Sequence, residues 1–275
     1  MKTEICVGAL PGRYREPVRV SCRKIMRLYP NTLALVVIGS VAVGTWEEDS
    51  DLDLVWIYRG RLRRKWREEM GYDYSGVVEF VTFNLSEVRR HMAWQSPMAH
   101  ALRRGVVIYD PAGLMARLRR GALGPPTREW MQQWFRHFWQ RLDWGRDSYR
   151  MSLKMHHRYC KTKCDCQVSE VLTRAVVNLA LVLLATKGIV PGAKSEMRLH
   201  FPSVIRGARH RKAMEIALQA HHVKRDLTLQ EAKELLRLGG WLRRQLTAIL
   251  GKPDFTPLPR KPRKSGAPSK GRKAV

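Results

Sequence analysis

Acidic residues are scarce in this sequence. It contains 24 Asp and Glu against 51 Lys and Arg, which gives a formal net charge of +27. The positive charge is spread along the chain, because residues 1–123, 124–251 and 252–275 carry net charges of +7, +13 and +7. A chain this basic is a poor match for cationic ligands and favours a polyanionic partner such as nucleic acid. An acidic membrane surface and an Arg-rich composition without a bound polyanion are the alternatives.

Cysteines and long apolar runs are also few. The five cysteines are an odd number, which does not indicate a disulfide framework in a chain of 275 residues. No apolar stretch follows the first residues, as a signal peptide would require. The longest apolar run, from Ala175 to Ala185, is interrupted by Asn178 and is too short to span a bilayer. These absences predict a soluble cytoplasmic protein with no membrane partner.

Two apolar runs with polar residues between them form the most informative stretch. The first run ends in Gly39-Ser40, and the second opens with Asp51 and Asp53. Because side chains alternate between the faces of a strand, the two carboxylates point the same way. They repel each other unless a cation lies between them, and Mg²⁺ is the usual cation beside phosphates. Gly39 allows close approach of a bulky anion, and Ser40 adds a hydroxyl. The stretch therefore fits a nucleoside triphosphate with Mg²⁺.

This order of apolar strand, Gly-Ser and Asp-apolar-Asp strand resembles the DNA-polymerase-β-type nucleotidyltransferase superfamily. The closest likeness is to its minimal and kanamycin-type branch, and it covers roughly residues 17–110. The third carboxylate of that family lies on a later strand, where Glu79 fits, and Asp73 in a loop is a rival. One departure is that Val43 stands where many members carry an Arg, just before a glycine.

The resemblance implies that three carboxylates hold two Mg²⁺ ions and carry the catalysis, while nearby residues bind the nucleotide. A turn cap is the alternative role for the Ser50 hydroxyl, and an exposed edge-strand position is the alternative for Glu79. The implied catalytic and metal-binding residues are Asp51, Asp53 and Glu79, and the implied nucleotide-binding residues are Gly39, Ser40 and Ser50.

Strands alternate with helices before residue 121, and helices dominate after it. This order predicts an α+β nucleotidyltransferase domain at residues 1–123, a mixed sheet with flanking helices. The break from Gly121 to Pro126 is the expected boundary. An all-α bundle domain at 124–251 and a basic disordered tail at 252–275 follow. The helix order of the bundle resembles the HEPN family (higher eukaryote and prokaryote nucleotide-binding).

Several local patterns set the expected helix limits. Pro17 is expected to start the first helix and Ser86 to cap a later one. Residues 188–202 read as a loop, and Thr228 opens the last helix with a capping-box pattern. An aromatic stripe at Trp130, Trp134 and Phe138 is expected to lie in the core, with nucleobase stacking as the alternative.

Histidines and cysteines cluster between residues 156 and 166. Their types fit Zn²⁺, but their spacing matches no standard zinc finger, so reduced thiols without metal are the alternative. Arg150 and His156 have a spacing used by HEPN ribonucleases, and in an Arg-rich chain this spacing arises easily by chance. The candidate zinc ligands are His156, Cys160, Cys164 and Cys166.

Together these features predict a Mg²⁺-dependent nucleotidyltransferase that binds an NTP such as ATP. It would transfer the NMP to a hydroxyl acceptor, and the net charge favours RNA, such as a tRNA end, as that acceptor. A small-molecule acceptor of the aminoglycoside type or a protein hydroxyl are alternatives. A non-catalytic module on the same fold, binding nucleic acid or another partner, is the alternative from a different class. The oligomeric state is left open by the sequence.

Overall fold

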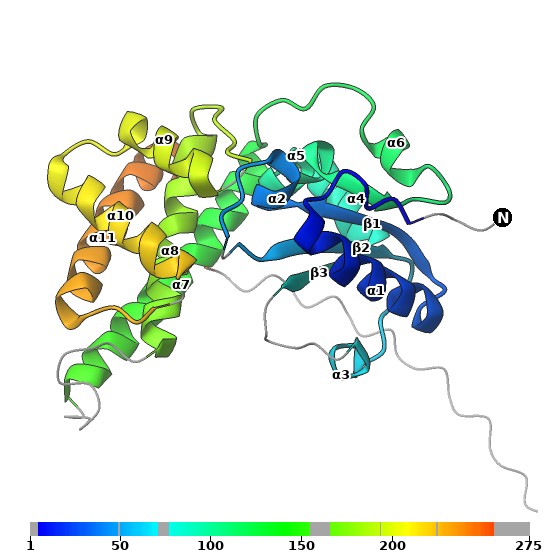
Figure 1. Cartoon of the computed structure of the whole chain (residues 1–275). Helices are drawn as coiled ribbons and strands as arrows, with labels where there is room; N and C mark the ends of the chain where they lie inside the picture. The colour runs from blue at the N-terminus through cyan, green and yellow to red at the C-terminus, as the bar shows by residue number, and fades with distance from the viewer. Residues whose placement is uncertain are drawn as a thin grey trace, which may run out of the picture.

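The computed structural model describes residues 5–48, 50–70, 77–154, 166–192, 194–223 and 225–255. A mixed four-stranded sheet with flanking helices lies beside a group of long helices (Figure 1). This is the predicted fold class, a nucleotidyltransferase-type α+β fold followed by a helical region. The predicted tail at 252–275 lies mostly outside the described residues.

The sheet has the strand order β3-β2-β1-β4. β1 pairs in antiparallel fashion with both β2 and β4, whereas β2 and β3 are parallel. The buried strands β1 and β2 are almost continuously apolar, because helices cover both of their faces. The strands are β1 (Thr32–Ile38), β2 (Leu52–Tyr58), β3 (Val78–Asn84) and β4 (Val106–Tyr109).

Each face of the sheet packs against its own set of helices. On one face, Leu54 and Trp56 of β2 join a core cluster with α1 and α3. On the other face, Val55 and Ile57 join a cluster with α4, α5 and α6. The alternation along β2 therefore divides its side chains between two cores. The helices are α1 (Gly12–Leu28), α3 (Trp66–Met70), α4 (Leu85–Ala93), α5 (Pro97–Arg104) and α6 (Leu114–Leu118).

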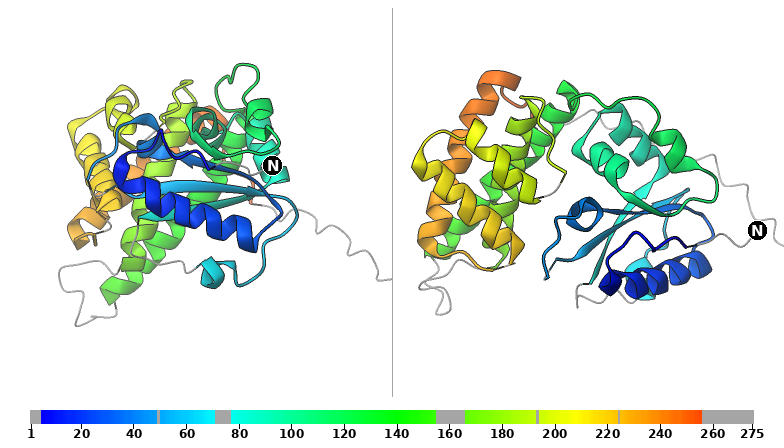
Figure 2. Two further views of the ribbon diagram at one scale, coloured as in Figure 1. Left: turned by 45° about the vertical axis from the view of Figure 1, so that its right-hand side comes forward. Right: turned by 45° about the horizontal axis from the view of Figure 1, so that its top comes forward.

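The helical region packs around α8. Its window Val168–Ala185 is long and apolar enough to cross a membrane by length and composition, but 78% of it is buried among the other helices. Trp130 and Phe138 also lie in this core, as expected for the aromatic stripe. The helices are α7 (Arg128–Lys154), α8 (Cys166–Ala185), α9 (Lys194–Val204), α10 (Ala208–His222) and α11 (Leu229–Leu250), shown from two further directions in Figure 2.

Three local expectations were wrong. α1 begins at Gly12 and contains Pro17, so the proline is not its start. The cap of α4 is Asn84 rather than Ser86, because the Asn84 side chain accepts the Glu87 N–H at 2.9 Å in a capping box. The expected loop at 188–202 contains most of α9, which accommodates Pro202 within its last turn. The capping box at Thr228, in contrast, is confirmed.

Candidate functional site

The end of β1 forms one side of the candidate site. Gly39 has a φ of +75° and opens α2 (Gly39–Val43), a short helix that directly follows β1. A Cβ atom at Gly39 would lie only 2.7 Å from Oδ2 of Asp53. The absence of a side chain at Gly39 therefore lets the Asp53 carboxylate lie directly against the backbone between β1 and α2. Ser40 is half-buried on this short helix.

The strand register places two of the predicted carboxylates side by side. Ile38 on β1 is opposite Asp53 on β2, and Asp53 is opposite Glu79 on β3. Directly paired residues on neighbouring strands project from the same face of the sheet. Asp51 lies two residues before Asp53, at the entry to β2, so alternation gives it the same side. All three carboxylates therefore belong to one face, at the end of the sheet where β1 ends.

The two aspartates and Glu79 differ in burial. Asp51 and Asp53 are half-buried, whereas Glu79 is exposed on β3, which is the edge strand next to β2. An exposed position on an edge strand is the alternative that the sequence offers to a metal-binding role for Glu79. The register with Asp53 is an additional feature that this alternative does not explain.

These residues fit a hard divalent cation in their chemistry. Carboxylate oxygens are the ligands that Mg²⁺ prefers, and here they come from adjacent strands beside a glycine that leaves space. Within the described ranges, no three His, Cys, Asp or Glu side chains gather closely enough to hold a metal ion as they stand.

Sequence reasoning missed two residues that hold the loop before Asp51. Arg13 donates to the backbone carbonyls of Glu48 and Ser50, the latter at 2.8 Å. The hydroxyl of buried Tyr14 also donates to the Ser50 carbonyl, at 2.7 Å. The Arg13 guanidinium lies 4.5 Å from the centre of the Tyr14 ring. The first turn of α1 thus fixes the backbone next to the first carboxylate.

The Ser50 hydroxyl is used within this loop. It accepts a hydrogen bond from the Glu47 N–H at 2.8 Å, and the Ser50 N–H donates to the Glu47 carbonyl at 2.9 Å. This pair of bonds is the turn-capping role that the sequence analysis gave as the alternative. A nucleotide contact by Ser50 stays a prediction.

The short helix α2 carries no cation of its own, since its sequence is GSVAV. It contacts α5 and α9, and these two helices are joined by an ion pair of 3.4 Å between Arg104 and Glu196. Glu196 also accepts the Gly192 N–H at 2.6 Å. Arg104 is therefore a cation on α5, a helix that contacts α2. On α2 itself, Val43 stands where the family pattern has an arginine.

Several predicted residues belong to segments outside the described part of the chain. Asp73, His156, Cys160 and Cys164 lie outside the described residues, and the side chain of Cys166 does as well. Arg150 is exposed on α7 and lies 3.8 Å from Asp147. The zinc and ribonuclease hypotheses therefore stay predictions.

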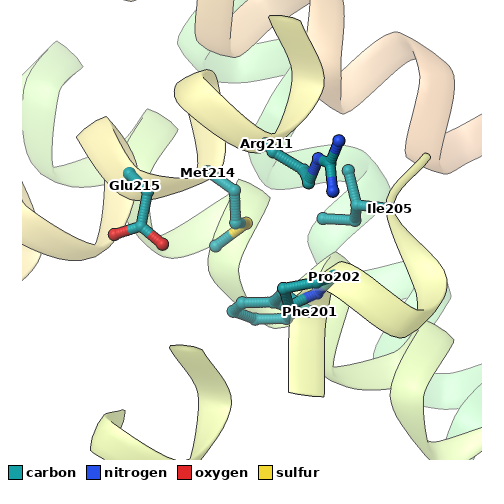
Figure 3. A pocket seen from close by; sticks show the side chains of 6 residues that line it. All are labelled: Phe201, Pro202, Ile205, Arg211, Met214 and Glu215. Carbon is teal, nitrogen blue, oxygen red and sulfur yellow. The ribbon is translucent and has the colours of Figure 1, made fainter. Parts of the chain in front are cut away.

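A hollow in the helical region lies away from these strand ends. It is open to solvent, has an empty volume of about 200 Å³ and lies between α9 and α10. Figure 3 shows the side chains of Phe201 and Met214 pointing toward one another in it. With one arginine and one glutamate at its rim, it offers no concentration of charge for a triphosphate. Its lining residues are Phe201, Pro202, Ile205, Arg211, Met214 and Glu215.

A family comparison covers the same part of the chain as the candidate site. Residues 21–93 match the family model of a nucleotidyltransferase domain. This range contains β1, α2, β2 and β3, and with them all six predicted site residues. The match supports the nucleotidyltransferase superfamily for this part of the chain, and transferase activity with it. No curated protein matches the chain.

Solved structures resemble the chain over most of its length. A spectinomycin adenyltransferase from Enterococcus faecialis, solved with ATP and spectinomycin, has a TM-score of 0.53 at 13% identity, covering 84% of this chain and 99% of its own. A nucleotidyltransferase-like protein from Exiguobacterium sibiricum has a TM-score of 0.39 at 17% identity, covering 85% of this chain and 77% of its own. The first likeness supports the fold, including the helical region, and says nothing of the ligand.

Proposed function

We propose that this chain is a Mg²⁺-dependent nucleotidyltransferase that transfers the NMP of a nucleoside triphosphate to a hydroxyl of RNA. The observation that carries the proposal is the row of Asp53 and Glu79 on paired strands, with the Asp53 carboxylate against Gly39. Few structural roles explain two like charges in direct register beside a glycine with positive φ. The family match over residues 21–93 supports the same reaction class.

In the proposed reaction, the acceptor oxygen attacks the α-phosphorus in line with the bond to the β-phosphate. The new P–O bond forms, the bond to the β-phosphate breaks, and pyrophosphate leaves. Asp51, Asp53 and Glu79 would hold Mg²⁺, which supplies charge stabilisation for the phosphoryl oxygens. Glu79, the most exposed of the three, would accept the acceptor proton. Gly39 and Ser40 would contact the triphosphate.

The choice of RNA as acceptor rests on charge. The net charge of +27 disfavours cationic acceptors such as aminoglycosides and favours a polyanion. We further propose two domains, residues 1–123 and 124–251. Separate hydrophobic clusters support this division. Two clusters contain only residues between positions 5 and 118, and the third has its buried members between positions 130 and 250.

One experiment tests the reaction class and the acceptor together. The purified protein is incubated with Mg²⁺, total RNA and each α-³²P-labelled NTP in turn. We expect label in RNA with at least one NTP, and no label when EDTA is added. Label in the protein alone would assign a protein acceptor. A parallel reaction contains spectinomycin as a small-molecule acceptor. The absence of label from RNA, from protein and from spectinomycin would favour the non-catalytic module and overturn the proposal.

The loop contact of Tyr14 gives a second prediction. Tyr14→Phe removes the hydroxyl that donates to the Ser50 carbonyl, one residue before Asp51. We expect kcat to fall about tenfold with little change in the KM for NTP, because the loop that positions the carboxylate loosens while the triphosphate contacts stay. The free energy of unfolding should fall by about 1 kcal/mol.

Tyr109→Phe is the matched control for this prediction. Tyr109 lies on β4, and its hydroxyl makes no hydrogen bond within the described part of the chain. Steady-state kinetics and thermal melts of both variants provide the comparison. An equal fall of kcat in both variants, or a rise of KM alone in Tyr14→Phe, would contradict the positioning role.

A further inference from the structure

The segment that follows β2 is the most basic stretch of the described structure. Six of the nine residues from 59 to 67 are Arg or Lys, and all six are exposed. The segment leads into α3, which contacts α1 (Figure 1). Arg23 and Arg27 are exposed one turn apart on α1 and extend the same surface. We call this the α1/α3 basic surface; it comprises Arg23, Lys24, Arg27, Arg59, Arg61, Arg63, Arg64, Lys65 and Arg67.

Contacts to the end of α1 and the turn after it hold this surface in place. The Asn31 side chain donates to the Arg59 carbonyl at 2.7 Å, and the Arg59 N–H donates to the Asn31 carbonyl at 3.0 Å. At the other end, Lys24 Nζ donates to the Met70 carbonyl at 2.9 Å. The Arg63 guanidinium lies 5.5 Å from the centre of the Tyr29 ring. The cations are thus presented by a segment anchored at both ends.

Little negative charge offsets these cations. Glu69 lies 3.4 Å from Arg63, and Glu68 lies 3.8 Å from Lys65. The hydrogen bond from Tyr29 and the charge of Arg63 lower the pKa of Glu69, and each of the two glutamates is already paired with a cation of the surface. In the part of the chain that the structure describes, no carboxylate pairs with Arg61 or Arg64. Nine cations face two carboxylates on this surface.

The apolar side chains of the segment point inward. Leu62 and Trp66 pack against the core cluster below α1, and Met70 is buried in it. A membrane-binding surface would instead expose apolar side chains for insertion between lipids. Seven of the nine cations are arginines, the other two being Lys24 and Lys65, and the planar fork of arginine matches phosphate oxygens. A surface of exposed guanidinium groups over a closed apolar core favours a phosphate backbone as its partner.

The surface lies at the opposite end of β2 from the candidate site. Asp51 and Asp53 are at the start of β2, whereas Arg59 directly follows its last residue, Tyr58. Seven strand residues separate the two ends by about 20 Å. Asp53 also projects toward the face covered by α4 and α5, whereas α1 and α3 cover the other face. A ligand that reaches both places must be long.

We propose that the α1/α3 basic surface is a docking site for the phosphate backbone of the RNA acceptor. The RNA body binds here while its reacting end enters the site about 20 Å away. This inference rests on the proposed function for the identity of the acceptor. It adds that the substrate is a structured RNA large enough to span both sites, not a short oligonucleotide.

The test measures RNA binding without NTP, so that it does not depend on catalysis. A fluorescein-labelled RNA hairpin with a single-stranded 3′ end is titrated with the full chain at several KCl concentrations. We expect Arg61→Glu/Arg64→Glu to raise the Kd about tenfold or more and to lower the slope of log K against log[KCl] by about 1.5, since two phosphate contacts are lost. Thermal melts should be unchanged, because both residues are exposed.

Arg141→Glu/Arg244→Glu is the control with the same change in charge. Both residues are exposed on the helical region, on α7 and α11. The rise in the Kd for RNA should be several-fold smaller in this control than in Arg61→Glu/Arg64→Glu. An equal loss in both variants would show binding by net charge alone and would overturn the docking site, as would an unchanged Kd in Arg61→Glu/Arg64→Glu.

Two further outcomes separate this inference from its alternatives. Flotation of the protein with phosphatidylserine vesicles tests a membrane partner. If Arg61→Glu/Arg64→Glu no longer floats with the vesicles but binds RNA with unchanged affinity, the proposal is overturned. RNA binding that depends on this surface, in a protein that transfers no label to RNA, would uphold the docking site and reject the proposed reaction.

Discussion

We expect Asp53→Asn to lower the rate of NMP transfer about 10³-fold or more. The change keeps the volume of the side chain and removes the charge that would hold Mg²⁺ beside the triphosphate. A loss of this size corresponds to several kcal/mol of transition-state stabilisation. Asp53 is the most constrained of the three carboxylates, because it is half-buried, in register with Glu79 and against Gly39.

Stability should respond in the opposite direction from activity. Asp53 and Glu79 are paired across neighbouring strands, and like charges directly opposite each other destabilise a sheet. The melting temperature of Asp53→Asn should therefore be unchanged or slightly higher. Asp226→Asn, which removes one exposed carboxylate in the helical region, is the control and should leave transfer unchanged. Retained turnover in Asp53→Asn would reject the assignment of this residue.

The sheet and the carboxylate pattern could be predicted because they depend on local signals. Alternation along β2 predicts that Asp51 and Asp53 lie on one side, and the two apolar runs predict the end of β1 and the start of β2 to within a residue. The pairing of Asp53 with Glu79, in contrast, does not depend on local signals. It depends on which strands become neighbours and in which register, and single-sequence periodicity carries no information about either.

The misses have physical causes that the sequence does not reveal. The sequence predicts a loop at 188–202 because Pro202 and the Pro191-Gly192 pair are helix-breaking signals. In the structure, burial of Met197 and Phe201 outweighs these signals and α9 forms. Arg13 and Tyr14 act through backbone carbonyls of a loop some 35 positions away. Carbonyl acceptors are present at every residue, so no motif marks the one that is used.

We also expect Gly39→Ala to lower the transfer rate about 10²-fold or more. A Cβ atom there would lie 2.7 Å from Asp53 Oδ2, which forces the carboxylate away from its place. A displacement of about 1 Å in a catalytic group is enough for a loss of this size. The positive φ of 75° adds backbone strain of about 1–2 kcal/mol for any residue other than glycine.

Gly44→Ala separates these two effects. Gly44 has a φ of +77°, close to that of Gly39, but nothing lies within 4 Å of its Cβ position. Both variants should therefore lose about 1–2 kcal/mol of unfolding free energy in denaturant titrations. Only Gly39→Ala should lose transfer activity at temperatures where both variants remain folded. An equal loss in Gly44→Ala would mean that the strained turn, and not the contact between Gly39 and the Asp53 carboxylate, governs the chemistry.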